Sequence, residues 1–268
     1  MNYDVLVVGS GPAGLAAAVA ARGRDKSVLV VGNPWQESPL ARAERIDNYL
    51  GLPGVNGREL MEHFSAHAQR VGVEFHTGRV VAVMAWEGFA LTAGSEVFQG
   101  RTLVLAPGVA RLAKYPGEAE LLGRGVSYCA TCDGMLYRGR AVTVVGRSKD
   151  APQEPKGLDR EIPFVRAGKL EVRGTDRVSA LVADGAELPC EGVFILRDAL
   201  APTDLLPDLE LRNGAIAVDR EMATSLPGVF AAGDCTGGPL QVAKAVGEGH
   251  TAGLSAAESV DRKRNEHQ

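Results

Sequence analysis

The hydrophobic pattern in the first part of the chain predicts a strand, a tight turn and a helix. Residues 4–8 are rich in Val and lead directly into a run of glycine and other small residues. An Ala-rich stretch follows to about Arg22, and a second apolar run covers residues 27–31. A strand, a helix and a second strand within about 30 residues are typical of a βαβ unit.

The rest of the chain alternates between strand-like and helix-like patterns. Residues 58–71 place apolar side chains at helical spacing, and residues 241–259 predict a final helix before a polar tail that begins at Asp261. The segment 147–157 is charged and contains two prolines, so no helix is expected there. Strands are expected within the alternating segment 73–99 and at 102–105, 141–145, 162–166, 169–173, 178–182, 192–196 and 229–232.

Composition narrows the class of protein without indicating a function. The 268 residues are 45% hydrophobic, so the chain can bury a sizeable core. A net charge of −4 gives no argument for nucleic acid or a membrane as a partner. No uninterrupted apolar run reaches the roughly 18 residues that a membrane-spanning helix needs. Four cysteines in a chain this long do not form a disulfide scaffold, and a cytoplasmic location is expected.

The turn after the first strand has the spacing of a dinucleotide-binding fingerprint. Gly9 allows the tight turn, Gly11 lets a pyrophosphate approach the backbone, and Gly14 allows the helix to pack closely on the strand. The N–H groups at the start of the helix can then bind the phosphates. The acidic residue expected about 20 positions further on is absent, since the second strand ends in Gly32 and Asn33. This argues against NAD and leaves FAD open; a glycine-rich turn without a ligand is the alternative.

Cys129 and Cys132 form a second motif, with two residues between them. This spacing brings two sulfurs together within one turn, so a disulfide can form and open without a large backbone movement. The adjacent Asp133 could carry protons between a thiolate and a substrate. A zinc site would need two further ligands, and Cys190 and Cys235 are isolated and expected to be buried fillers. We therefore interpret the pair as redox-active, with two inert buried thiols as the other alternative.

Together these motifs resemble the low-molecular-weight thioredoxin reductases. The resemblance rests on the glycine turn and on residues 46–49, 128–134 and 226–234. It implies an α/β fold, with a Rossmann-like FAD-binding domain and a smaller inserted, truncated second domain of the dinucleotide-binding type. The implied boundaries are 1–112 plus 200–268 for the discontinuous FAD-binding domain and 113–199 for the domain that carries the cysteine pair.

The resemblance also implies which residues act on the cofactor and the substrate. Cys132 would face the flavin, and Cys129 would attack the disulfide of the partner. Asp234 would bind the ribityl chain of FAD, with Gln241 and Val242 beside the flavin ring. The implied cofactor-binding residues are Gly9, Ser10, Gly11, Pro12, Ala13, Gly14, Gly32, Leu40, Asn48, Val81, Ala106, Gly108, Gly233, Asp234, Gln241 and Val242.

The sequence lacks the second dinucleotide motif that ordinary members of this family use for NADPH. The strand at 141–145 leads into Gly-Arg-Ser-Lys-Asp at 146–150, where charged side chains replace a glycine-rich turn. Only about 50 residues separate this strand from the one at 192–196, fewer than the roughly 60 that two βαβ crossovers need. We therefore expect no ordinary nicotinamide site. The shortened chain resembles the ferredoxin-dependent flavin thioredoxin reductases and their deeply rooted relatives without NADPH motifs.

Without a nicotinamide site, the electrons must come from another carrier. Residues 138–177 contain ten Lys or Arg and six Asp or Glu, a local charge of +4 that would attract a small acidic carrier such as a ferredoxin. A solvated face with incidental charge is the alternative. The family resemblance implies a thioredoxin-like protein as the electron acceptor and a homodimer as the assembly.

Two rival functions fit the same motifs. A dithiol oxidase would move electrons from a thiol substrate to oxygen and would make peroxide without an added donor. A flavin-bound regulatory or interaction protein with little turnover would not need Cys129, Cys132 and Asp133, so their presence favours an enzyme.

Overall fold

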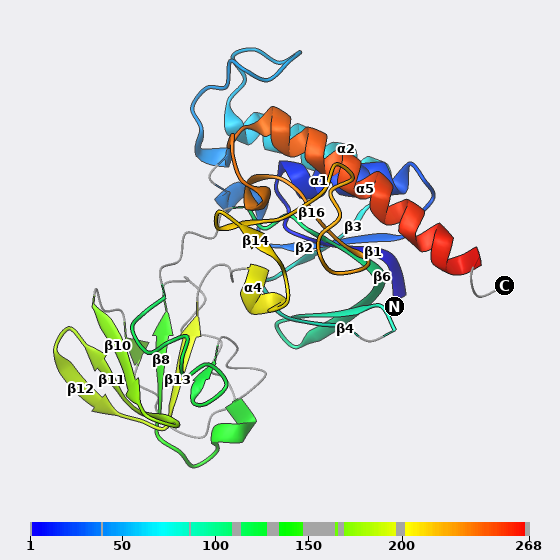
Figure 1. Ribbon diagram of the computed structural model, residues 1–268. Coiled ribbons are helices and arrows are strands. Elements are labelled where there is room, and N and C mark those ends of the chain that lie inside the picture. The colour runs from blue at the N-terminus through cyan, green and yellow to red at the C-terminus, as the bar shows by residue number, and fades with distance from the viewer. Residues whose placement is uncertain are drawn as a thin grey trace. The chain divides into compact units, whose positions relative to one another are not determined.

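The computed structural model describes residues 2–38, 40–85, 87–108, 114–127, 134–146, 164–165, 169–196 and 202–265. The chain forms two compact units, each with its own sheets (Figure 1). Unit 1 comprises Met1–Ala110 and Ala199–Gln268, and unit 2 is Arg111–Asp198, which lies between those two segments in the sequence.

Unit 1 is built on a seven-stranded sheet with the order β3-β2-β1-β6-β5-β4, in which β16 also pairs with β6. The carboxyl-terminal half of β6 runs parallel to β1 and β16, and its amino-terminal half pairs antiparallel with β5. One long strand therefore joins a parallel dinucleotide-type sheet to an antiparallel meander. The strands are β1 (Asn2–Val8), β2 (Val28–Gly32), β3 (Glu74–Thr77), β4 (Val80–Ala85), β5 (Phe89–Ala93), β6 (Glu96–Leu105) and β16 (Val229–Ala231).

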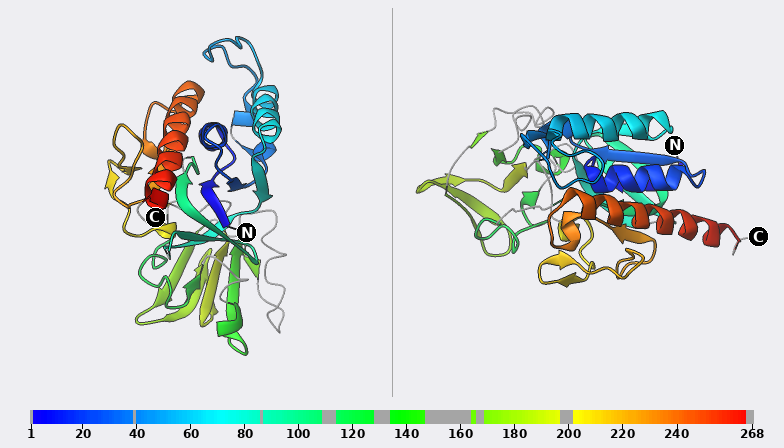
Figure 2. Two further views of the ribbon diagram at one scale, coloured as in Figure 1. Left: turned by 90° about the vertical axis from the view of Figure 1, so that its right-hand side faces the viewer. Right: turned by 90° about the horizontal axis from the view of Figure 1, so that it is seen from above.

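Three helices cover one side of the parallel strands of unit 1. They are α1 (Pro12–Arg22), α2 (Gly57–Arg70) and α5 (Val242–Asn265), and α1 lies between the other two (Figures 1 and 2). The shorter elements of this unit are η1 (Trp35–Glu37), η2 (Leu40–Arg42), α4 (Pro202–Leu205), β14 (Leu211–Arg212), β15 (Ala215–Ile216) and η4 (Asp234–Thr236).

Small residues bring the backbones of α1 and α5 into direct contact. A Cβ atom built on Gly249 would lie 2.1 Å from the carbonyl oxygen of Ala13, and one built on Gly253 would lie 2.2 Å from that of Ala17. No residue larger than glycine fits at either place without a shift of the backbone. The Ala-rich sequence of α1 is therefore explained by what packs against it as well as by helix propensity.

Helix α5 is longer than the range 241–259 that the sequence predicts. It continues to Asn265, and the polar tail expected from Asp261 forms its last turn. The Lys26 ammonium lies 2.6 Å from the Asp261 carboxylate, and Arg264 lies 3.4 Å from the Asp4 carboxylate. Positive side chains in a last turn also favour the helix, because the carbonyl end of a helix carries partial negative charge.

Unit 2 combines a parallel sheet, in the order β7-β13-β8-β9, with a separate antiparallel sheet, β10-β11-β12. The core of the parallel sheet contains Phe194 and Leu196 of β13 packed on Val142 and Val144 of β8. The elements are β7 (Val126–Ser127), η3 (Gly134–Tyr137), β8 (Val142–Gly146), β9 (Phe164–Val165), β10 (Leu170–Gly174), β11 (Val178–Ala183), β12 (Ala186–Pro189) and β13 (Gly192–Leu196).

The strands expected from the sequence are present near the expected positions, with one difference. The pattern at 102–105 is the second half of β6 rather than a separate strand. The expectation that no helix forms at 147–157 lies outside the described residues. The α/β class with parallel sheets is confirmed. Among the residues that the structure describes, no helix is long and apolar enough to cross a membrane.

Candidate functional site

The glycine turn between β1 and α1 has the geometry that its spacing predicts. Gly9 adopts φ +113°, and a Cβ atom there would lie 2.2 Å from the carbonyl oxygen of Ala106. A Cβ on Gly14 would lie 1.9 Å from the carbonyl oxygen of Gly9. A Cβ on Gly11, by contrast, would meet no atom within 4 Å. Gly9 and Gly14 are therefore needed by the fold, whereas Gly11 keeps the backbone open to a ligand.

The start of α1 offers backbone donors at this open position. The N–H groups of Ala13 and Gly14 belong to the first helical turn, where no acceptor exists within the helix. No side chain caps the helix, and Pro12 at its start has no N–H of its own. Free N–H groups and the positive end of the helix dipole favour a bound phosphate.

Ser10 joins this turn to the end of β2. Its hydroxyl donates a hydrogen bond of 2.6 Å to the carbonyl oxygen of Asn33. A Cβ on Gly32 would lie 2.8 Å from the backbone nitrogen of Ser10, so glycine at position 32 allows the two strand ends to approach. This close approach leaves no room for an acidic side chain at position 32.

The carboxyl end of β16 meets the same turn. Gly233 has φ +86°, and a Cβ there would lie 2.8 Å from the Cβ of Ala13. The half-buried Asp234 follows, and within the described residues no hydrogen bond reaches its carboxyl group. Burial raises the pKa of Asp234, the charge of Lys244 opposes this rise, and the charge of Glu248 adds to it. A half-buried carboxyl without a protein partner is suited to bind a hydroxyl of a ligand.

The parallel strands explain why these motifs meet although they are far apart in the sequence. β1, β2, β6 and β16 run in the same direction, so their carboxyl ends share one edge of the sheet. Ligands of open α/β sheets bind at this edge. The expected residues that the structure brings to it, at these strand ends and in the segments that follow them, are Gly9, Ser10, Gly11, Pro12, Ala13, Gly14, Gly32, Ala106, Gly108, Gly233 and Asp234.

The other expected cofactor residues lie in different surroundings. Leu40 and Val242 pack on one apolar cluster, formed around Leu60 of α2. Gln241 is exposed, and its carbonyl oxygen accepts the hydrogen bond from the Ala245 N–H in the first turn of α5. Asn48 lies on the exposed loop before α2 and Val81 at a bulge in β4, and no described contact joins either to the glycine turn.

Cys129, Cys132 and Asp133 lie outside the described residues, and only the elements on either side of them are described. β7 precedes them and pairs with β13. η3 follows them, and the Tyr137 ring packs edge-on against Phe194 with a centroid distance of 5.4 Å. The roles expected for the three residues therefore remain a proposal.

The two remaining cysteines are buried and free, as the sequence predicts. Burial raises the pKa of the Cys190 thiol, and it raises the pKa of the Cys235 thiol to about 12. Burial and a raised pKa both disfavour the reactive thiolate form of these two residues. Among the described residues, no group of three His, Cys, Asp or Glu side chains could hold a metal ion.

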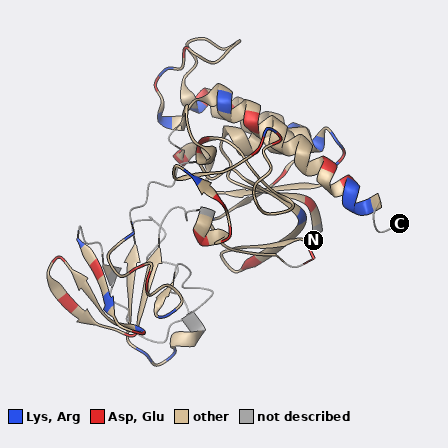
Figure 3. Cartoon of the chain, viewed as in Figure 1, with Lys and Arg blue, Asp and Glu red and all other residues tan. Residues whose placement is uncertain are grey.

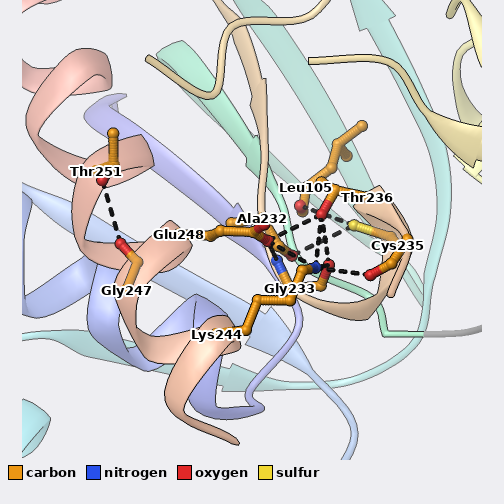
Figure 4. A network of polar contacts seen from close by, with 10 residues as sticks. Leu105, Ala232, Gly233, Cys235, Thr236, Lys244, Gly247, Glu248 and Thr251 are labelled. Atoms are coloured by element: carbon orange, nitrogen blue, oxygen red, sulfur yellow. Dashed lines mark hydrogen bonds and ion pairs between the residues drawn. The ribbon is translucent and has the colours of Figure 1, made fainter. Parts of the chain in front are cut away.

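Sequence reasoning missed three residues beside Asp234: Thr236, Lys244 and Glu248. They form a network of hydrogen bonds and an ion pair around the loop that carries Asp234 (Figure 4). The signal in the sequence is a pair of opposite charges four positions apart at the start of the final helix. Such pairs usually mark a solvated helix surface, so the pattern alone does not indicate a site.

Comparison with known proteins assigns the chain to a family. A sequence model for pyridine nucleotide-disulphide oxidoreductases matches residues 3–148 and 159–249. The chain belongs to this family. The thioredoxin reductase of Listeria monocytogenes is 30% identical over 300 aligned residues, which cover 97% of this chain and 94% of the relative. The expected resemblance to thioredoxin reductases is thereby confirmed.

Solved structures of thioredoxin reductases agree with the assignment. A ferredoxin-flavin thioredoxin reductase from Clostridium acetobutylicum is 38% identical with a TM-score of 0.88, covering 97% of this chain and 99% of that one. A thioredoxin reductase from Gloeobacter violaceus is 31% identical with a TM-score of 0.76, covering 100% and 95%. The suspected shortened type of thioredoxin reductase is therefore supported by sequence and by structure.

This member of the pyridine nucleotide-disulphide oxidoreductases is an FAD-dependent enzyme of the thioredoxin reductase type. The residues at the sheet edge fit FAD. The open backbone at Gly11 and the free N–H groups of α1 suit its pyrophosphate, and the carboxyl group of Asp234 suits one of its hydroxyl groups.

Proposed function

We propose that this FAD-dependent enzyme passes electrons from a ferredoxin, rather than from a nicotinamide, through Cys129 and Cys132 to the disulfide of a thioredoxin-like protein. The observation that carries the proposal is the TM-score of 0.88 with a ferredoxin-flavin thioredoxin reductase, over 97% of this chain. The charged sequence at 146–150, in place of a second glycine-rich turn, supports it independently.

Each unit has a part in this proposal. Unit 1 would bind FAD, with the pyrophosphate on residues 10–13 and a hydroxyl group of the cofactor on Asp234. When bound there, FAD supplies electron-transfer chemistry that amino-acid side chains lack. Unit 2 would carry the cysteine pair. The remaining cofactor residues expected from the sequence, among them Leu40, Asn48 and Val81, belong to the same proposal.

The chemistry proposed for the cysteine pair is thiol–disulfide exchange. Reduction of the Cys129–Cys132 disulfide takes up two electrons and two protons and yields two thiols. The Cys129 thiolate then attacks one sulfur of the partner disulfide, which forms a mixed disulfide and releases the other partner sulfur as a thiolate. Cys132 attacks the Cys129 sulfur, so the internal disulfide forms again and the partner leaves as a dithiol. Asp133, the next residue, would carry the protons.

Anaerobic titration of the yellow protein tests the donor. Reduced ferredoxin, NADPH and NADH are added separately, and the flavin absorbance is followed. We expect rapid bleaching by reduced ferredoxin and none by the nicotinamides. Rapid bleaching by NADPH would overturn the donor assignment and would leave the disulfide chemistry standing.

The place where the donor docks is proposed from charge. Part of the basic segment 138–177 is described, and there β10 carries charged side chains of both signs (Figure 3). Arg173, for example, lies 3.2 Å from Glu171 and 2.9 Å from Glu187. The described residues of the segment contain five Lys or Arg and two Asp or Glu, and the remaining residues, which include Arg147 and Lys149, contain five Lys or Arg and four Asp or Glu. Both parts of the segment are therefore net positive.

Salt and charge reversal test this docking surface. The rate of reduction by ferredoxin should fall with ionic strength, and Arg147→Glu with Lys149→Glu should slow it several-fold at low salt. Arg262→Glu, on the exposed end of α5, reverses one charge outside the segment and is the control for Arg147→Glu alone. Rates that respond neither to salt nor to the double reversal would contradict docking here.

The assembly is proposed to be a homodimer, as the family resemblance implies. Sedimentation equilibrium of the holoprotein is expected to give twice the mass of the 28.2 kDa chain. A monomer at all concentrations would reject this part of the proposal alone.

A further inference from the structure

One turn of α5 holds the loop after β16 through two charged side chains (Figure 4). The Lys244 ammonium lies 2.9 Å from the carbonyl oxygen of Gly233, 2.7 Å from that of Gly237, and 3.0 Å from both the Thr236 hydroxyl and the Glu248 carboxylate. An ammonium group has three protons, so all three are engaged.

The Glu248 carboxylate completes the same set of contacts. It accepts hydrogen bonds of 2.9 Å from the Gly233 N–H and 2.8 Å from the Thr236 hydroxyl. Gly233 is therefore held at both its N–H and its carbonyl group. Loop residues on both sides of Asp234 are bonded to side chains that are four positions apart on one helix.

The local energetics of the helix do not explain this pair. Lys244 lies in the first turn of α5, where the helix dipole disfavours a positive charge. A Lys that precedes a Glu by four positions is also the weaker of the two orders for a helix ion pair. The two side chains are only 16% and 21% exposed, so both lose hydration. The contacts with the loop therefore explain why Lys244 and Glu248 occupy positions that do not favour the helix.

The residue that these contacts fix is Asp234. Gly233 precedes it and is bonded as described. Cys235 follows it, buried, with its sulfur 3.5 Å from the carbonyl oxygen of Leu105 and 3.3 Å from that of Ala232. The backbone on each side of Asp234 is thus held, while its own carboxyl group has no hydrogen bond within the described residues.

We propose that Lys244 and Glu248 are positioning residues, which hold the 233–237 loop in the shape that presents the Asp234 carboxylate to a hydroxyl group of FAD. This inference rests on the proposed contact between Asp234 and the cofactor. It predicts that the loop is already formed before FAD binds, so that little of the binding free energy is used to order it.

Titration of the apoprotein with FAD by calorimetry tests the proposal without any turnover. Lys244→Met, which keeps the side-chain length and removes the charge, should weaken FAD binding by at least about tenfold. Glu248→Gln should weaken it less, because the amide oxygen still accepts from Gly233 and Thr236. Arg262→Met, in an exposed ion pair of the same helix with Glu258, is the matched control and should change the affinity less than about twofold.

A double-mutant cycle separates positioning of Asp234 from general support of the fold. In the Asp234→Asn background, Lys244→Met should weaken FAD binding less than about threefold, because the contact that it positions is already lost. An equal loss in both backgrounds would overturn the proposal. If Lys244→Met does not fold, the same cycle with Glu248→Gln carries the test. A wild-type apoprotein that does not bind FAD would instead overturn the proposed cofactor site.

Discussion

At the scale of single residues, Gly11 and Gly14 differ in what an added methyl group would meet. Gly14→Ala places a Cβ 1.9 Å from a backbone oxygen, so it should destabilise the apoprotein by at least about 2 kcal/mol. Gly11→Ala meets open space, so the apoprotein should keep its melting temperature while FAD affinity falls at least about tenfold. Thermal unfolding of the apoprotein and calorimetric titration with FAD measure the two effects. Equal behaviour of the two variants would contradict a phosphate site at Gly11.

Cys235 makes the stability of the apoprotein sensitive to alkaline pH. Burial raises the pKa of its thiol to about 12, whereas a thiol in the unfolded chain ionises near about 8.5. The stabilisation is fully present below that lower value and is lost as the pH rises toward about 12, because only the unfolded chain then releases the proton.

Urea unfolding at a series of pH values measures this effect. The free energy of unfolding should fall between about pH 9 and pH 11, and more steeply in the wild type than in Cys235→Ala. Part of the slope should remain in the variant, since burial and the hydrogen bond to Glu74 also raise the pKa of Tyr3 to about 12. Identical slopes in the two proteins would show that the Cys235 thiol ionises freely in the folded state.

Some residues of the site could be predicted from the sequence, and others could not. The glycine turn could be predicted because it needs a particular backbone conformation at a strand end, whereas the Gly233-Asp234 pair was expected only through the family resemblance. Lys244 and Glu248 could not be predicted, because their partners are mostly backbone atoms of a loop that only the fold brings near. Local spacing carries no information about such partners.

At the scale of elements, the contact between α1 and α5 depends on glycine at one face of α5. Gly253→Ala would place a Cβ 2.2 Å from the carbonyl oxygen of Ala17 and should destabilise the protein by roughly 1–3 kcal/mol. Gly247→Ala, on the exposed side of the same helix, meets no atom within 4 Å. It should stabilise the protein by roughly 0.5–1 kcal/mol, because alanine favours a helix.

Chemical denaturation measures the free energy of unfolding of both variants. Gly253→Ala should be less stable than the wild type, and Gly247→Ala should be more stable. If Gly253→Ala were as stable as Gly247→Ala, the two helices would not touch at this point.

Element type was easier to predict than element extent and pairing. The apolar runs of β1 and β2 identify strands buried on both faces, as parallel strands are. The extension of α5 past residue 259 depends on contacts with Asp4 and Lys26, which are distant in the sequence. Periodicity near Asp261 is polar and does not show them. For the same reason, the two patterns at 73–99 and 102–105 do not reveal that one strand, β6, serves two kinds of sheet.

At the scale of the whole molecule, unit 2 interrupts unit 1 in the sequence, but each unit has a core of its own. The main core of unit 1 joins residues from both of its segments, for example Val5 and Val7 with Phe230 and Val260. Unit 1 is therefore completed only after unit 2 has been synthesised. A core built across an insertion also means that a ligand bound at the sheet edge stabilises both segments of unit 1 together.

This separation of cores leads to a prediction about hydrogen exchange. FAD at 100 times its dissociation constant stabilises the unit that binds it by about 2.7 kcal/mol, which corresponds to roughly 100-fold slower exchange of amides that require its unfolding. With the Cys129–Cys132 pair kept oxidised, FAD should slow exchange in β1, β6 and α1 of unit 1, and slow it much less in β10–β12 of unit 2. Mass spectrometry of peptides from the same sample measures both units, so β10–β12 serve as an internal control.

Gly11→Ala at the same FAD concentration should reduce the effect in unit 1. Equal protection of β10–β12 and β1 would mean that the two units unfold as one cooperative body, and the assignment of FAD to unit 1 would then need evidence other than stability.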